Sequence, residues 1–175
     1  MPTSRSQRRS TSSTVPRWAD LAAEAPALAE AGRALIYQFG VGLGYLATVR
    51  QDGGPRIHPV CPILANDGLY VFLIPSPKRA DLLRDPRFAL HTNGPEKTDD
   101  EFYVTGKARR VADTTVRAIV AAAYHVQVPD DHELFELEID HALHAKYKGH
   151  GDWPPIYTRW PHPRGAARPR PGSPS

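Results

Sequence analysis

Residues 69–90 read LYVFLIPSPKRADLLRDPRFAL, and their hydrophobic period changes twice. The first part, 69–74, is aromatic and β-branched enough to form a buried strand. Residues 75–86 then predict a short helix, with a serine that can cap it, a proline in its first turn and an Asp-Pro pair that ends it. Residues 87–92 return to a strand pattern. The run therefore predicts a strand, a short helix and a second strand.

The segment before this run changes from a helical to a strand period. Apolar residues recur at intervals of three and four from 18 to 39, which predicts helix, and Pro26 divides this stretch into two helices. Residues 42–50 and 56–64 form two strands on either side of the sequence QDGG (51–54), whose Asp-Gly pair is a strong hairpin signal. The sequence thus predicts two helices followed by an antiparallel hairpin.

The segment after the run continues mainly in strands. Residues 101–112 alternate as a long strand, in which Gly106 marks a bulge or a site of close approach. A helix is expected at 113–125, a strand at 133–140 and a last edge strand within 153–160. This order predicts a mainly β domain, a barrel or sandwich with peripheral helices.

Composition separates the folded part from the two ends of the chain. Residues 1–16 and 161–175 are rich in Ser, Pro and Arg, carry three arginines each and no acid, and cannot bury enough apolar surface to fold. We therefore expect two disordered tails and one domain over residues 17–160. Without the six tail arginines, 16 of the 22 Lys and Arg residues remain against 19 Asp and Glu, so this domain is slightly acidic.

These features argue against several classes of protein. A slightly acidic domain lacks the clustered basic surface of a nucleic-acid-binding protein. No apolar stretch approaches the roughly 18 residues of a membrane span, and the N-terminal tail lacks the apolar centre of a secretory signal. A single cysteine, Cys61, rules out an internal disulfide framework. We therefore expect a cytoplasmic protein whose partners include neither nucleic acid nor membrane.

The main candidate for a binding site is the helix start at residues 76–79, Ser-Pro-Lys-Arg. Free backbone N–H groups and the helix dipole favour an anion there, and Lys78 and Arg79 add positive charge. Cations in a first turn oppose the dipole, so a bound phosphate accounts for them better than a solvated first turn does. Arg56 would join this site if its strand pairs with residues 69–74; taken alone, it is an ordinary surface residue.

Other polar residues carry weaker signals. His58 either donates a hydrogen bond or proton near a bound ligand or packs in its strand. Cys61 is more commonly a small buried hydrophobe than a reactive thiol. His141, His144 and His150 lack the spacing of a metal site, so we expect no metal and a solvated helix or loop there.

Three runs, taken in order and spacing, resemble a known family. They are TVRQDGGPRIHPV (48–60), LYVFLIPSPKRADLLRDPRFAL (69–90) and EFYVTGKARRV (101–111). The chain resembles the pyridoxamine 5'-phosphate oxidase-like family over about residues 30–140. This resemblance implies an FMN-binding split β-barrel, antiparallel and Greek-key-like, and a homodimer that completes the cofactor site across its two-fold interface.

The same resemblance assigns residues to a phosphate site. Arg56, Ser76 and Lys78 stand where the family has an arginine on the second strand and a Ser-Arg-Lys group at the helix start, which bind the cofactor phosphate. Pro77 replaces the family arginine, and Arg79 beside it is the candidate substitute.

The resemblance also places the cofactor ring. Glu101 stands where the oxidases have a glutamine that contacts the cofactor, and Cys61 stands where they have a lysine that touches the isoalloxazine. The residues expected along the ring are Ile57, His58, Pro59, Val60 and Cys61.

The resemblance implies an oxidoreductase that transfers hydride at the ring of FMN, with F420 as the alternative cofactor and haem third. The substrate is an unidentified small molecule, and it is not pyridoxamine phosphate, because the Arg-x-x-x-x-Lys pattern is incomplete and the C-terminal Arg-Leu-x-Pro ending is absent. No catalytic residue beyond His58 is expected. The alternatives are a non-catalytic flavin, haem or tetrapyrrole binding or storage protein, and a structural dimer without a ligand.

Overall fold

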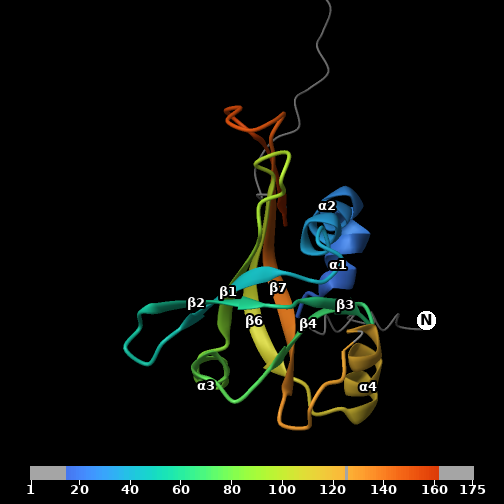
Figure 1. The fold of residues 1–175 in the computed structure, drawn as a ribbon, viewed down its shortest axis with the longest axis vertical. Helices are drawn as coiled ribbons and strands as arrows, with labels where there is room; N and C mark the ends of the chain where they lie inside the picture. Colours follow the sequence, from blue (N-terminus) through green and yellow to red (C-terminus); the bar gives the residue numbers. More distant parts are fainter. Residues whose placement is uncertain (1–14, 125, 162–175) are drawn as a thin grey trace, which may run out of the picture.

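The computed structural model describes residues 15–124 and 126–161, which form four helices and eight strands (Figure 1). The predicted tails lie outside the described residues, except for residues 15, 16 and 161. The elements are α1 (Trp18–Glu24), α2 (Pro26–Ile36), β1 (Gly44–Val49), β2 (Pro55–Val60), β3 (Ile63–Ala65), β4 (Gly68–Leu73), α3 (Pro77–Arg84), β5 (Arg87–Thr92), β6 (Glu101–Arg110), α4 (Thr114–Ala123), β7 (Glu133–Lys146) and β8 (Ile156–Trp160). None of the helices in the described part of the chain has the length and hydropathy needed to cross a lipid bilayer.

The strands form one antiparallel sheet in the order β2-β1-β5-β6-β7-β4-β3, with β8 paired to β7. The predicted hairpin is confirmed, since β1 pairs with β2 on either side of residues 50–54. The long strand β7 pairs with β6 along one edge, and along the other it pairs first with β4 and then with β8. This arrangement confirms the mainly β class with peripheral helices.

The sheet curls back on itself at the connection between β2 and β3. These two strands stand at opposite ends of the sheet order, yet only Cys61 and Pro62 separate them in the chain. The three steps from Val60 to Ile63 span at most about 11 Å, so the two ends of the sheet must come close together. In Figure 1 the β2 and β3 ribbons accordingly cross the long strands β6 and β7.

Two expectations for this region are wrong. The strand predicted at 56–64 is divided into β2 and β3, because its first part pairs with β1 and its last part with β4, at opposite ends of the sheet order. Strand β2 pairs with β1 and not with β4, so Arg56 does not reach the helix start through that pairing. The curl of the sheet, rather than a shared ladder, brings β2 close to α3.

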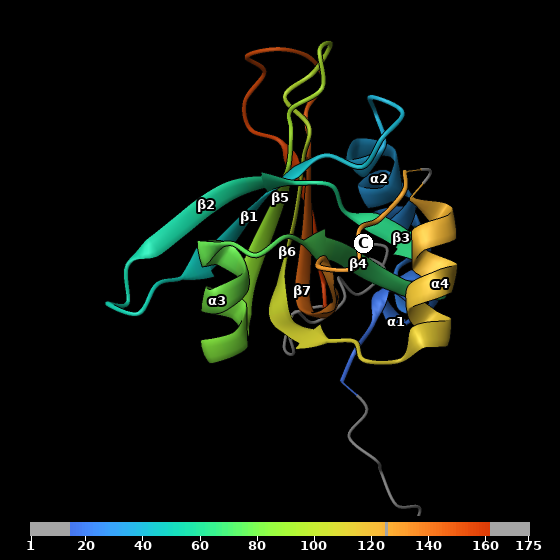
Figure 2. The same ribbon diagram turned by 60° about the horizontal axis from the view of Figure 1, so that its bottom comes forward.

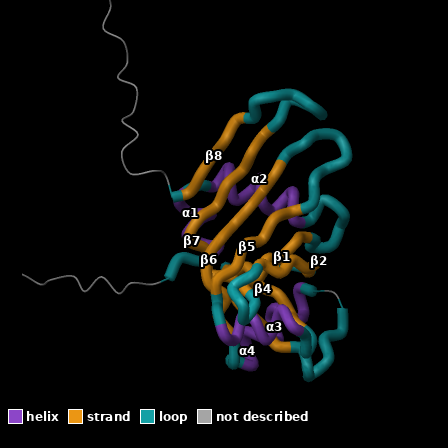
Figure 3. Tube along the Cα trace, turned by 90° about the vertical axis from the view of Figure 1, so that its left-hand side faces the viewer, coloured by secondary structure: helices purple, strands orange, loops and turns teal. Residues whose placement is uncertain are grey.

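Helices cover the sheet at two places. Helices α1 and α2 pack against β6 and β7, where Trp18 meets Phe102 edge to face with ring centroids 6.0 Å apart. Helix α3 lies beside the β1–β2 hairpin and α4 beside β3, as Figure 2 shows. Figure 3 shows α3 and α4 together at the end of the sheet away from β8. The second pair of helices therefore frames one end of the curled sheet.

Strands β6 and β7 carry one confirmed and one wrong prediction. The ladder shifts register between Thr105 and Gly106, which confirms the bulge. A Cβ at Gly106 would lie 1.8 Å from the Glu138 carbonyl oxygen, so only glycine fits there. His141 and His144 lie within β7 and not in a helix or loop, because β7 continues its ladder with β6 through both residues and pairs with β8 from Ala142 onward.

Candidate functional site

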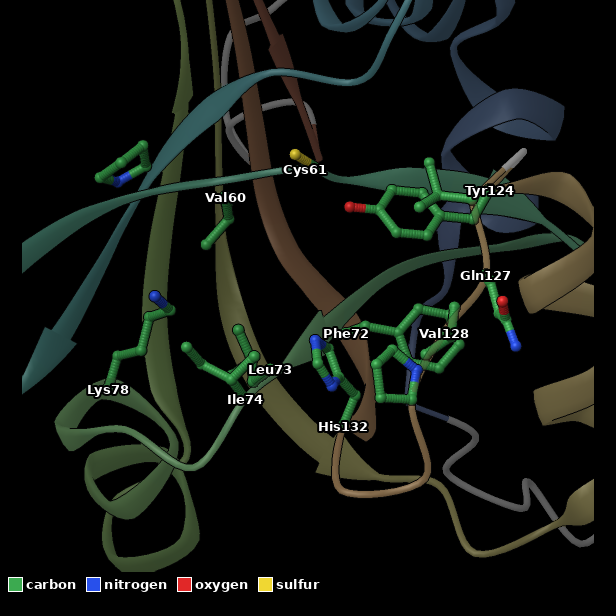
Figure 4. Close-up of a pocket in the computed structure, with 13 residues that line it drawn as sticks. Val60, Cys61, Phe72, Leu73, Ile74, Lys78, Tyr124, Gln127, Val128 and His132 are labelled. Carbon is green, nitrogen blue, oxygen red and sulfur yellow. The ribbon is translucent and has the colours of Figure 1, made fainter.

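A pocket of about 270 Å³ lies where the ends of β2 and β4 meet the start of α3 (Figure 4). Most of its lining is apolar, and none of the described lining residues is a carboxylate. The lining residues are Pro59, Val60 and Cys61 at the end of β2, Phe72, Leu73 and Ile74 at the end of β4, Lys78 of α3, and Tyr124, Val126, Gln127, Val128, Pro129 and His132 between α4 and β7. The pocket therefore joins segments that are distant in the sequence.

Lys78 supplies the positive charge of this pocket. It is half-buried in the first turn of α3, and Figure 4 shows its side chain extending from the helix toward β2. No hydrogen bond or ion pair of the Lys78 ammonium is found within the described residues. The hydroxyl of Ser76 donates to the Ile74 carbonyl at 2.9 Å and does not cap the helix. The first-turn amides of Lys78 and Arg79 therefore have no side-chain acceptor in this part of the chain.

Arg56 is close to α3 through an ion pair that no sequence pattern predicted. Its Nε donates to Oδ2 of Asp81 at 2.7 Å, and the Thr48 hydroxyl donates to the same oxygen at 2.9 Å. Arg84 contacts the other carboxylate oxygen at 3.3 Å. Burial raises the pKa of Asp81, but the hydrogen bonds from Arg56, Thr48 and Arg84 outweigh it and hold the pKa below its usual value. The buried carboxylate thus fastens α3 to β1 and β2.

The ion pair also fixes where Arg56 lies relative to Lys78. Asp81 and Lys78 are three residues apart on α3, so they are neighbours on the surface of the helix. Arg56 and Lys78 therefore lie on the same side of α3, although Arg56 is not part of the pocket lining.

The other predicted residues lie outside the pocket lining of the single chain. Ile57 lies on the outer face of β2 and is 64% exposed. His58 is half-buried on the core-facing side of β2, where it pairs with Leu46 of β1. The Arg79 guanidinium donates to the Asp131 carbonyl at 2.8 Å. Glu101 pairs with Ala145 at the end of β6 that is far from α3. Pro59, Val60, Cys61 and Lys78 are therefore the predicted residues that one chain brings together.

Tyr124 is a pocket residue that sequence reasoning missed. Burial raises its pKa to about 12, with the neighbouring Cys61 thiol adding to the shift, so the phenol stays protonated at neutral pH. Figure 4 shows its hydroxyl directed toward Cys61. Tyr124 ends an alanine-rich helix, and residues 126–132 contain no recognisable motif, so the sequence carries no local signal for this part of the site.

The described residues contain no candidate metal site. No group of three or more His, Cys, Asp or Glu side chains within them is placed to hold a metal ion. His150 instead lies against Asp99, with 2.8 Å between its Nδ1 and the Asp99 Oδ1.

Comparison with known proteins finds similarity in structure only. No family model and no curated protein matches the sequence. A heme-binding protein from Mycobacterium smegmatis matches with a TM-score of 0.55 and 19% identity, over 73% of this chain and 57% of that chain. A NimC/NimA family protein from Clostridium acetobutylicum matches with a TM-score of 0.54 and 18% identity, over 74% and 94%. General stress protein 26 from Bacillus anthracis matches with a TM-score of 0.53 and 21% identity, over 66% and 91%.

These likenesses concern the fold. The matched region spans little more than half of the mycobacterial protein, and all three identities are low. The curled antiparallel sheet, with helices at its periphery, agrees with the architecture of the matched structures. The chain is thus a split β-barrel.

Proposed function

We propose that this chain binds a flavin-type cofactor by its phosphate and transfers hydride between that cofactor and a small molecule. FMN is the first candidate, F420 the second and haem the third. The observation that carries the proposal is Lys78, a half-buried ammonium at a helix start, beside an apolar pocket and with no carboxylate partner in the described residues. A phosphate at this point would accept hydrogen bonds from the ammonium and from the first-turn amides.

The residues around Lys78 fit a flat ring attached to such a phosphate. Pro59, Val60 and Phe72 supply an apolar wall, and the Tyr124 phenol supplies a hydrogen-bond donor at its far side. The cofactor itself would supply the hydride chemistry. The role of the chain is to bind the phosphate, orient the ring and limit the access of water.

We also propose a homodimer in which the second copy completes the site. The pocket is slightly smaller than the roughly 300–1,000 Å³ of typical ligand sites, so one chain would cover only part of a flavin nucleotide. Tyr45 and Ile57, 47% and 64% exposed, lie on one face of the β1–β2 hairpin. Pro59 lies on this same face and also lines the pocket. A partner on this face would therefore lie next to the pocket.

The position of Glu101 is compatible with this dimer. Tyr45 pairs with His91, which pairs with Tyr103, so these side chains share the face that carries Ile57. Glu101 is two residues from Tyr103 on the same strand and therefore lies on that face too. In a two-fold assembly it can approach the pocket of the partner.

The absorption spectrum of the purified protein tests the proposal. Flavin bands, a single deazaflavin band and a Soret band distinguish FMN, F420 and haem, and titration of the colourless protein with each compound gives the affinity. Uptake of FMN or F420, followed by reduction of the bound compound with a hydride donor, supports an oxidoreductase. A protein that takes up none of the three compounds contradicts the proposal.

A binding or storage protein without turnover is the second candidate. It is suggested by the fold shared with a heme-binding protein, which is a reason to include haem among the compounds tested. Tight binding of haem, or of a flavin that hydride donors do not reduce, would select this candidate over the enzyme.

A further inference from the structure

Within the described residues, the guanidinium of Arg117 in α4 makes two hydrogen bonds and one cation–π contact, and all three are with residues that line the pocket. One terminal nitrogen donates to the His132 carbonyl at 2.6 Å, and the other donates to the Pro129 carbonyl at 3.0 Å. The guanidinium carbon lies 5.1 Å from the centre of the Phe72 ring. Arg117 itself does not line the pocket. The Arg117 side chain therefore connects Phe72 with residues 129 and 132 without itself facing the pocket.

The same segment is held from its other side by Arg79. This arginine of α3 donates to the Asp131 carbonyl at 2.8 Å. Two helices therefore bind three carbonyls within residues 129–132. A surface loop without such bonds is among the first parts of a protein to open locally, so these bonds are expected to limit its motion.

Helix α4, which carries Arg117, is held in place at its N-terminus and along its buried face. The Asp113 carboxylate caps the helix by accepting from the amides of Thr115 and Val116 at 2.8 and 3.2 Å, and Val120 is buried against β3 and β4. Tyr124, at the end of the helix, lies 6.0 Å from Phe72 between ring centroids. Phe72 is therefore in contact with α4 through both Arg117 and Tyr124.

We propose that Arg117 is a positioning residue, which holds residues 126–132 as a preformed wall of the pocket and so sets the width open to a ligand ring. The guanidinium is suited to this task because its planar fork holds two N–H donors in a fixed geometry toward the two carbonyls, whereas a lysine is a compact charge on a flexible stem. A wall fixed before binding reduces the ordering cost of binding. The ligand in this inference rests on the proposed function, whereas the fixed wall does not.

Cys61 provides a test that needs no ligand. It lines the pocket, is half-buried and is the only cysteine of the chain, so alkylation by N-ethylmaleimide reports on this site alone. We expect Arg117→Met to raise the alkylation rate by about tenfold and to speed amide exchange in residues 126–132, while exchange in β4 and β7 stays as in the wild type. The alkylation and exchange rates of Arg117→Lys should lie between those of the wild type and those of Arg117→Met. Arg87→Met, which removes an exposed arginine paired with Asp85, is the control and should change neither rate.

FMN then serves as the ligand probe on the same proteins. We expect Arg117→Met to weaken its affinity by about tenfold, with partial recovery in Arg117→Lys. Wild-type alkylation and exchange rates in Arg117→Met would overturn the inference, and so would faster alkylation with unchanged FMN affinity. If FMN neither binds the wild type nor protects its Cys61, FMN is excluded as the cofactor, and the alkylation and exchange rates still decide whether Arg117 holds the wall.

Discussion

Arg56 on strand β2 and Asp81 on helix α3 form an ion pair in which Arg56 Nε lies 2.7 Å from Asp81 Oδ2. The two elements share no ladder, so this contact fixes the distance between the strand that lines the pocket and the helix that carries Lys78. Asp81 is 4% exposed, and hydrogen bonds from two arginines and one threonine satisfy its buried carboxylate oxygens.

The first prediction concerns the stability that Asp81 provides. Asp81→Asn removes a buried negative charge and leaves Arg56 and Arg84 without their anion, so the free energy of unfolding should fall by about 3 kcal/mol. Urea unfolding at neutral pH measures this loss of stability. Asp140→Asn removes an exposed carboxylate of β7 that has no hydrogen-bond partner among the described residues and is the matched control, with no expected change. Equal midpoints for both variants would contradict the role given to Asp81.

The second prediction concerns the phosphate. Lys78→Met should weaken FMN binding by about 1.5–3 kcal/mol, or roughly 10- to 150-fold, because a charged hydrogen bond to phosphate is lost. The affinity for riboflavin, which has no phosphate, should stay the same. Fluorescence titration with both compounds measures the difference, and Lys107→Met, on an exposed position of β6, is the control. Parallel losses for FMN and riboflavin would show that Lys78 does not bind phosphate.

The third prediction concerns the proposed dimer. Ile57→Asp places a charge on the exposed face of β2, so it should yield a folded monomer if that face meets a second copy. Analytical ultracentrifugation gives the mass, and circular dichroism checks the fold. Leu83→Asp is a control on α3, where a side chain of similar exposure lies away from this face. A dimer that survives Ile57→Asp unchanged would place the interface elsewhere.

The fourth prediction concerns the bulge in β6. Gly106→Ala should lower the free energy of unfolding by about 3 kcal/mol, because the new Cβ overlaps the Glu138 carbonyl and forces the β6–β7 ladder apart. Gly94→Ala, at an exposed position where an added Cβ would meet no atom within 4 Å, should have almost no effect. Thermal unfolding of the two variants provides the comparison, and similar midpoints would be incompatible with the close approach.

The fifth prediction concerns pH. Both ring nitrogens of His150 face acceptors, the Asp99 carboxylate at 2.8 Å and the Glu96 carbonyl at 2.6 Å, so only the imidazolium donates to both. The hydrogen bond with Asp99, with a further one to the Glu96 carbonyl, raises the pKa of His150. A raised folded-state pKa means that the stabilisation is complete below the usual value of about 6.5 and is lost as pH rises through the raised value.

Proton NMR titration of His150 and of the Gly151 amide, which donates to Asp99 at 2.7 Å, should follow this transition. His150→Gln should abolish it, and His141→Gln, at an exposed position of β7, should preserve it. A His150 that titrates below its ordinary pKa would refute the assignment.

Local patterns in the sequence predicted the kind of element well. The hairpin around residues 51–54, the division of the helices at Pro26 and the bulge at Gly106 each depend on short-range chemistry, and all three are confirmed. Strand order is different, because it depends on contacts between distant segments. For that reason the pairing of β2 and the extension of β7 to Lys146 were missed.

The candidate site divides in the same way. Residues of β2 and the start of α3 could be proposed from charge, turn chemistry and family resemblance, and Pro59, Val60, Cys61 and Lys78 do line one pocket. The ion-pair partner of Arg56 and the wall at residues 126–132 could not be proposed from the sequence. An aspartate that faces inward from a helix, and a loop without a motif, can be assigned a role only when the positions of the surrounding elements are known.

The pairing of β4 with β7 has a consequence for how the chain folds. Tyr70 and Glu136 are more than sixty residues apart in sequence yet are direct partners, so their ladder requires the closure of a long loop. Both flanks of the pocket depend on that closure, because one follows β4 and the other precedes β7. The cavity is therefore expected to be assembled late in folding, and a compound bound there would slow unfolding more than it speeds refolding.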